Sequence, residues 1–442
     1  MRRAVTPALF IGLALSSSLA SAQMPAGVAI PNTAAGIVLR AWLDAFNSGD
    51  TARLGAYYRQ YQPELSAGSS LAFREKTGGF DLLGVERSEP RRLEFMVKEH
   101  NGPTTAYGVI AVSDTQPARA TTFRLVGLGP EVKVTDMRLD SPTRVRVVNG
   151  AIAQLDTFYV FPDVAKQIAD SLHARLARGA YDAYGNGMSF ALKLSEDVRE
   201  IGRDKHLRVE YSVPALPPRA TVRSFPTPDV IARRRARMDE INCGFVKAEQ
   251  LPGNIGYLKF NQFADPELCG PTASAAMTFL ASARALIIDI RENGGGNPAM
   301  VAYISSYLFS RRTHLNDLWN RTSGETEEFW TQDSVAGRRF GGDKPVYVLT
   351  SSRTFSGAEE FSYNLKALKR ATIVGETTGG GAHPVSDRRI DDHFTIGVPG
   401  ARAINPITHT NWEGVGVEPD VKVPAPEALA TAQRLIRERL QP

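Results

Sequence analysis

Residues 345–368 read PVYVLTSSRTFSGAEEFSYNLKAL, and the rest of the chain can be interpreted outward from this stretch. Its apolar beginning, residues 345–349, predicts a buried strand, and residues 361–368 predict a helix. Ser356 therefore falls in the turn between a strand and a helix. Free backbone N–H groups and the positive end of the helix dipole face such a turn, where they can stabilise negative charge next to a hydroxyl nucleophile.

The same stretch also fits a purely structural role. Ser356, with Glu359 three residues later, matches a capping box, in which the two side chains satisfy the first free amides of a helix. Such caps are common, so this stretch alone does not identify an active site. The choice between nucleophile and cap depends on the remaining motifs.

Strands, loops and helices alternate in the chain before this turn. Residues 255–260 and 286–290 predict buried strands, and residues 272–283 and 299–309 predict helices. This order of apolar strands and helices predicts a layered α/β domain. Residues 291–297, RENGGGN, directly follow the second strand. Glycines in that position let backbone amides approach a ligand closely.

Two further motifs lie at the ends of predicted elements. GETTGGGAHP, residues 375–384, follows a predicted strand at 371–374, and NWEGVGVEPD occupies residues 411–420. The glycine-rich loops lack both the G-K-S/T ending and the G-x-G-x-x-G spacing of phosphate-binding loops. An amide-lined hole for a tetrahedral intermediate fits the glycine triplet better. The sequence does not show whether these loops converge.

Four motifs occur in the order of a known family. They are DIRENGGG at 289–296, TFSGAEE at 354–360, GETTGGG at 375–381 and GVEPD at 416–420. Together they resemble the C-terminal processing and tricorn-type serine peptidases, and most of all the branch that contains the repeats of interphotoreceptor retinoid-binding protein. The resemblance implies an α/β fold with a crotonase-like ββα catalytic domain.

The resemblance also implies roles for individual residues. Ser356 matches the nucleophile, and the amides of Gly295 and Gly357 match the oxyanion hole. The processing-protease branch uses a lysine of the second glycine loop as its base, and Gly381 stands at that position here. A Ser–Lys dyad is therefore not expected.

A histidine base is expected instead. His206, in a tight connection between a predicted helix and a predicted strand, and Glu413 match the histidine and glutamate of the tricorn-type arrangement, whereas Lys205 replaces the serine beside that histidine. We expect Ser356 to act as nucleophile, His206 as general base, and Glu413 to orient or polarise that base. His383, in the second glycine loop, is a rival base, because a base must lie within hydrogen-bonding reach of the nucleophile.

The chain before the peptidase-like core divides into further units. We expect an N-terminal α+β domain at residues 23–140, a helical part of the peptidase module at 141–213, a linker at 214–240 and the core at 241–442. In the first unit, apolar residues recur at helical spacing over 39–46, and helices precede strands. This pattern resembles the cone fold of ketosteroid-isomerase-like (SnoaL-like) domains.

Residues 1–22 predict a signal peptide, since two arginines precede an apolar run at 8–15 and Ala20-Ser21-Ala22 forms a cleavage motif. Eight apolar residues cannot cross a bilayer, so we expect an exported protein, periplasmic or secreted, without membrane association. Cys243 and Cys269, the only cysteines, could pair in such a protein or remain buried thiols.

These observations favour an exported serine peptidase that hydrolyses peptide or protein substrates through an acyl-enzyme. The formal net charge of +5 is too small to argue for nucleic acid. The seven histidines show no ligand spacing, so neither a metal nor another cofactor is expected. The alternative is a non-catalytic binding protein for hydrophobic small molecules or peptides, which would need none of Ser356, His206 and Glu413. The sequence leaves the oligomeric state and the natural substrate open.

Overall fold

The computed structural model describes residues 28–63, 68–130, 132–217 and 228–440. The chain forms two compact units that divide between Val132 and Lys133, whereas the sequence placed the end of the first unit at residue 140. The predicted signal peptide, residues 1–22, lies outside the described residues, and so does part of the predicted linker, residues 218–227.

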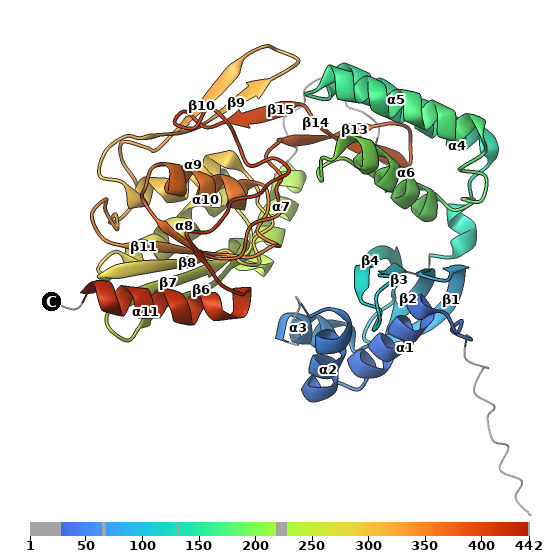
Figure 1. The fold of residues 1–442 in the computed structure, drawn as a ribbon, viewed down its shortest axis with the longest axis horizontal. Coiled ribbons are helices and arrows are strands. Elements are labelled where there is room, and N and C mark those ends of the chain that lie inside the picture. The colour runs from blue at the N-terminus through green and yellow to red at the C-terminus, as the bar shows by residue number, and fades with distance from the viewer. Residues whose placement is uncertain (1–27, 64–67, 131, 218–227, 441–442) are drawn as a thin grey trace, which may run out of the picture. The chain divides into compact units, whose positions relative to one another are not determined.

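Helices precede strands in the first unit (Figure 1). The helices are α1 (Ala34–Asn47), α2 (Thr51–Tyr61) and α3 (Gly68–Thr77), and the strands are β1 (Phe80–Glu89), β2 (Arg92–Glu99), β3 (Thr104–Val112) and β4 (Ala120–Pro130). The strands pair antiparallel in chain order. Leu39, Trp42 and Phe46 are buried on one face of α1 and share a core with Phe95 of β2. The helical spacing of the apolar residues thus supplies the face that covers the sheet.

The second unit is built around a central sheet in the order β16-β12-β11-β8-β7-β6. Its strands are β6 (Phe245–Leu251), β7 (Ile255–Phe260), β8 (Ala285–Asp289), β11 (Val346–Thr350), β12 (Thr372–Gly375) and β16 (Val421–Lys422). All neighbours run parallel except the edge strand β6, which is antiparallel to β7.

Helices cover both faces of this sheet. On one face lie α8 (Pro266–Leu280), α9 (Pro298–Ser305) and α10 (Gly357–Ala367), and on the other lies α11 (Ala428–Leu440). Alternate strand residues point to opposite faces, so Leu286 and Ile288 pack in the core of the first group while Ile287 packs with α11. The expected layered α/β arrangement of the core is therefore confirmed.

The remaining helices of this unit are α4 (Ser141–Phe158), α5 (Pro162–Ala177), α6 (Gly187–Gly202) and α7 (Pro228–Glu240). Two smaller sheets have the orders β13-β14-β5 and β10-β9-β15. Their strands are β5 (Arg208–Tyr211), β9 (His314–Asn320), β10 (Thr326–Trp330), β13 (Val385–Arg389), β14 (Phe394–Pro399) and β15 (Ala401–Ile404). Pairing of Val209 with Ile396 joins the helical segment to the C-terminal part of the chain, which places the residues just before β5 beside the second glycine loop.

The parallel strands β8, β11 and β12 are neighbours, so their carboxyl ends lie at the same edge of the sheet. The loops at 290–297, 351–356 and 376–384 leave the sheet at that edge. The three motifs that are separated in the sequence therefore converge.

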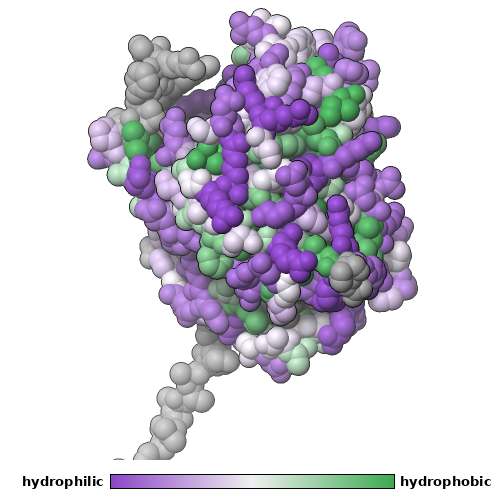
Figure 2. All heavy atoms as spheres, turned by 90° about the vertical axis from the view of Figure 1, so that its left-hand side faces the viewer, coloured by the Kyte–Doolittle hydropathy of each residue, from purple (hydrophilic) through white to green (hydrophobic). Residues whose placement is uncertain are grey.

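A disulfide joins Cys243 to Cys269 and links the start of β6 to α8, which resolves the alternative left open by the sequence. Among the described residues, no helix is both long and apolar enough to cross a membrane. On the face shown in Figure 2, hydrophilic side chains predominate and hydrophobic ones are scattered between them.

Candidate active site

Ser356 occupies a strained turn at the start of α10. The residue immediately precedes Gly357, the first residue of the helix. Its φ of 54° and ψ of −122° lie in a region that residues other than glycine rarely adopt. An ordinary N-cap residue is extended, and strained backbone of this kind concentrates at functional sites. The conformation therefore favours an active-site role over a purely structural cap.

Glu359 fixes this turn against the second glycine loop. Its carboxylate accepts hydrogen bonds from the N–H groups of Ser356 at 2.8 Å, Gly380 at 2.6 Å and Gly381 at 2.8 Å, and from the hydroxyl of Thr378 at 2.5 Å. Burial raises the pKa of Glu359, and these hydrogen bonds oppose that rise. The carboxylate thus serves both the capping box and the anchoring of a loop that is distant in sequence.

The first glycine loop lies directly against Ser356. A Cβ added at Gly295 would lie 2.7 Å from Ser356 Cβ and from Gly357 N. However, the N–H of Gly295 donates to Asn293 Oδ1 at 2.8 Å and is not free. Among the described residues, no acceptor engages the N–H of Gly296 or of Gly357. This corrects the expectation for Gly295: the free amides beside the serine are those of Gly296 and Gly357.

Ser356 borders a cavity with a volume of about 420 Å³. Its lining residues include Gly296, Gly357, His206 and Phe355. The residues that carry the hydroxyl, the imidazole and the two free amides therefore line one cavity.

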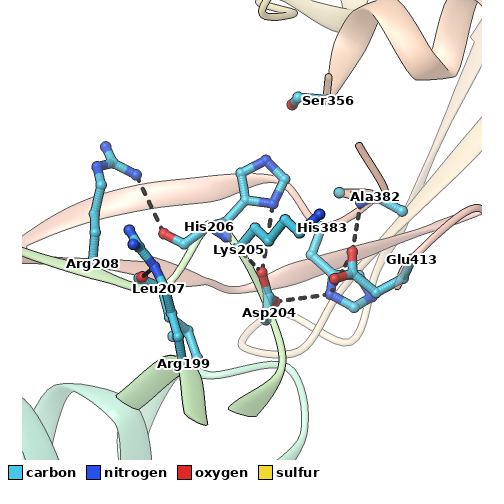
Figure 3. A network of polar contacts seen from close by, with 12 residues as sticks. Arg199, Asp204, Lys205, His206, Leu207, Arg208, Ser356, Ala382, His383 and Glu413 are labelled. Carbon is cyan, nitrogen blue, oxygen red and sulfur yellow. Dashed lines mark hydrogen bonds and ion pairs between the residues drawn. The ribbon is translucent and has the colours of Figure 1, made fainter. Parts of the chain in front are cut away.

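Asp204 supports His206 from behind. Asp204 Oδ1 lies 3.6 Å from His206 Nδ1 and accepts the backbone N–H of His206 at 2.9 Å. The imidazole packs on the ring of Phe355, with centroids 4.8 Å apart. Figure 3 shows the ring between Asp204 and Ser356, with its second nitrogen towards the serine. No hydrogen bond joins that ring to the serine hydroxyl within the described chain, and such contacts are often long before substrate binds.

Asp204 remains ionised despite being buried. Burial alone would raise its pKa, but the hydrogen bonds and charges of His206 and His383 hold the pKa well below its usual range. The carboxylate can therefore stabilise a positive charge on His206. The sequence analysis assigned no role to Asp204, although it stands two residues before the histidine.

His383 lies behind the cavity. Its Nδ1 is 3.0 Å from Asp204 Oδ2 and 3.3 Å from Glu413 Oε2, so the ring bridges two carboxylates. Figure 3 shows the His383 ring beside Asp204 and Glu413, whereas the His206 ring lies nearer to Ser356. The structure thus brings His206 towards the serine, and it places the rival base in the supporting network.

Glu413 belongs to the same network. Its Oε2 accepts the N–H of Ala382 at 2.5 Å. Burial and the negative charge of Asp204 raise the pKa of Glu413, and His383 opposes this. Glu413 offers an oxygen within 4.8 Å of the His206 ring, but within the described residues no hydrogen bond joins the two. Asp204, which the sequence analysis overlooked, is thus the carboxylate nearest to that ring.

His206 also occupies the space that a side chain at position 381 would need. A Cβ added at Gly381 would lie 2.7 Å from His206 Cε1 and 2.3 Å from Phe355 Cζ. A lysine cannot stand there while the histidine holds its position. Glycine at position 381, where the processing-protease branch has its lysine, therefore leaves the space that His206 occupies.

Within the part of the chain that the structure describes, Asp204, His206 and Glu413 could offer ligand atoms to a metal ion, since these atoms lie within 4.8 Å of one another. Both carboxylates already accept hydrogen bonds from protein donors, namely His383 and the N–H of Ala382. This is the environment of carboxylates that orient a histidine.

Residues 254–423 match the model of Peptidase family S41. The tricorn protease of Thermoplasma volcanium is 29% identical over 148 residues, which cover 33% of this chain and 13% of that protein. The chloroplastic carboxyl-terminal-processing peptidase 2 of Arabidopsis thaliana is 27% identical over 210 residues, which cover 46% of this chain and 39% of the relative. The chain thus spans less than half the length of these relatives. A crystal structure of the tricorn protease aligns with a TM-score of 0.44 at 14% identity, over 81% of this chain and 41% of that one.

Proposed function

We propose that this chain is a serine peptidase with Ser356 as nucleophile and His206 as general base, since residues 254–423 match the model of Peptidase family S41 and the chain is similar to tricorn and carboxyl-terminal-processing peptidases. The observation that carries the proposal is that the strained Ser356, the His206 imidazole and two free amides face one cavity.

The geometry supports acyl-enzyme chemistry in two half-reactions. His206 removes the proton from the Ser356 hydroxyl as its oxygen attacks the peptide carbonyl carbon. The N–H groups of Gly296 and Gly357 stabilise the resulting oxyanion. His206 then gives the proton to the departing amine, and the C–N bond breaks. Water next attacks the acyl-enzyme carbonyl and loses a proton to His206. His206 returns that proton to the Ser356 oxygen as the ester C–O bond breaks, which releases the peptide acid and restores the free serine.

The carboxylates differ in their roles in this proposal. Asp204 orients His206 and stabilises its charged form, because it is ionised and nearest to the ring. Glu413 acts on the same imidazole across 4.8 Å or less and holds His383 in place. His383 thus positions Asp204 and does not contact the nucleophile.

The proposal also includes the fold type of each unit, the location of the protein and the class of its substrates. We propose a crotonase-like core, and a cone fold for the first unit, which is supported by helices packed on an antiparallel sheet. We also propose export to a periplasmic or external location, on the strength of the arginines and apolar run in residues 1–22. The substrates are peptides or proteins.

Labelling with a fluorophosphonate, followed by intact mass measurement, tests the proposed function. We expect one adduct on the wild type and none on Ser356→Ala, while Ser352→Ala, which changes an exposed serine of the same loop, should label like the wild type. His206→Ala should slow labelling by about 100-fold or more, and His383→Ala by less than about 10-fold. If the folded wild type forms no adduct with the fluorophosphonate, the peptidase proposal is wrong, and the alternative of a non-catalytic binding protein is favoured.

A further inference from the structure

Glu360 lies in the cavity one helical turn beyond Ser356. The two residues are four positions apart at the start of α10 and therefore share a helix face. Glu360 lines the cavity, but only 4% of its surface is exposed. Glu360 has no role in the proposed acylation or deacylation steps.

The carboxyl lacks a complete set of partners. Among the described residues, Glu360 Oε1 has no hydrogen-bond partner. The amide of Asn316, which is fully buried on β9, lies near enough to lower the pKa of Glu360 but completes no hydrogen bond to that oxygen. Asn364 Nδ2 is likewise without a partner. Buried polar atoms in proteins are almost always hydrogen-bonded, so the unpaired Oε1 of Glu360, a residue that lines the cavity, points to a missing ligand.

Electrostatics indicate the charge of that ligand. Burial raises the pKa of Glu360 to about 8, and the amides of Asn316 and Asn364 only partly offset this. A positive charge in the cavity would favour the ionised carboxylate and pair with it. Of the residues that the structure describes, Glu360 and His206 are the acidic and basic side chains that line the cavity, and no described lysine or arginine does so. Asp204, behind the histidine, adds negative potential.

The rest of the cavity suits a long side chain with an apolar stem. Pro298, Leu318 and Trp412 are among the lining residues. Lysine and arginine place methylene groups along apolar walls and carry donors at the tip. An ammonium group has three donors, one of which could pair with Glu360 Oε1.

We propose that Glu360 is the specificity-determining residue of this cavity and selects peptides with lysine or arginine on the acyl side of the scissile bond. This proposal rests on the proposed peptidase function. A neutral aliphatic side chain would leave the buried carboxyl unpaired, and an acidic one would be repelled by it.

Paired fluorogenic peptides test the proposal. The peptides differ only at the acyl-side residue, which is lysine, its uncharged analogue norleucine, or glutamate. For the wild type, kcat/KM should be about 100-fold higher with lysine than with norleucine, as expected for a charged hydrogen bond, and lowest with glutamate. In Glu360→Gln, the ratio of lysine to norleucine should fall to about 3-fold or less. Equal cleavage of the two by the wild type, or an unchanged ratio in a folded Glu360→Gln, would overturn the proposal.

Binding measurements separate this proposal from the peptidase function. Ser356→Ala lacks the nucleophile but keeps Glu360, and it should bind the lysine peptide at least about 10-fold more tightly than the norleucine peptide by calorimetry. If the wild type labels with fluorophosphonate but shows no preference, only the specificity proposal fails. If the wild type neither labels nor cleaves, the peptidase function fails, and the affinities measured on Ser356→Ala still decide whether the cavity prefers a cation.

Discussion

Asp204 Oδ1 lies 3.6 Å from His206 Nδ1, and the other oxygen of the same carboxylate lies 3.0 Å from His383 Nδ1. One buried carboxylate therefore holds two imidazoles, of which only the first faces Ser356. The second imidazole reaches Glu413 and so ties the two carboxylates together. Because the side chains of this network differ in their contacts, we expect their substitutions to reduce peptidase activity to different extents.

Replacing Asp204 by asparagine should strongly reduce turnover. The amide has almost the same shape, but it carries no charge and can hold the His206 ring in the wrong tautomer. We expect kcat to fall by on the order of 10³-fold with the fold retained. Peptide hydrolysis by the purified variant, with circular dichroism as the control for folding, measures this. A decrease smaller than that of Glu413→Gln would contradict the assignment of Asp204 as the principal partner of His206.

A change in the first glycine loop should disable the oxyanion hole. Gly296 has a φ of +140°, and a Cβ added there would lie 2.1 Å from the carbonyl oxygen of Phe263. Gly296→Ala should therefore move the free amide away from the cavity and lower kcat by about 10²-fold to 10³-fold. Gly294→Ala is the matched control, because a Cβ there meets nothing within 4 Å. Equal losses in the two variants would argue against Gly296 as an oxyanion donor.

The central architecture could be predicted from the sequence because each strand and loop is indicated by a short run of adjacent residues. Apolar runs such as residues 286–290 and the glycines after them define strands and loops at neighbouring ends of a parallel sheet. The strand at 255–260 has the predicted bounds. Ser356 stood out because its turn follows from the strand before it and the helix after it. Its backbone strain could not be predicted, because that depends on contacts with a loop that is distant in sequence.

The supporting residues were less predictable for the same reason. The predicted oxyanion donor, Gly295, was one residue away from the free amide of Gly296, because the N–H of Gly295 donates to Asn293 Oδ1 in the folded chain. Asp204 was overlooked because nothing in the sequence shows that its carboxylate meets His383. The contact between Asp204 and His383 spans 179 positions in the chain, where residue spacing carries no information. The contact between Gly295 and Asn293 is local, but it depends on side-chain and backbone geometry that the residue pattern does not specify.

The disulfide should stabilise the second unit. Cys243 and Cys269 are buried and 26 residues apart, so their bond closes a loop of moderate length in the unfolded chain. The double variant Cys243→Ser/Cys269→Ser should lose about 3 kcal/mol of unfolding free energy. Urea denaturation of both proteins, with a parallel measurement of the wild type in reductant, tests this. If reductant leaves the wild-type midpoint unchanged, the bond contributes no stability.

The stability of the protein should depend on the ionisation of Glu360. Its pKa is about 8 in the folded chain and about 4.5 when the side chain is solvated, so the folded state binds this proton more tightly than the unfolded state. The contribution of the group is fully present below pH 4.5 and is lost as the pH rises towards 8. At one pKa unit per 1.36 kcal/mol, the loss is at most about 5 kcal/mol.

Glu360→Gln removes this titration but keeps Glu359 and Glu413, whose pKa values are also raised. Urea unfolding of both proteins at several values between pH 5 and 8 isolates the contribution of Glu360. The wild type should lose unfolding free energy relative to the variant as the pH rises, and the difference should level off above pH 8. Parallel curves would mean that Glu360 titrates alike in the folded and unfolded chain, and therefore that its carboxyl is solvated.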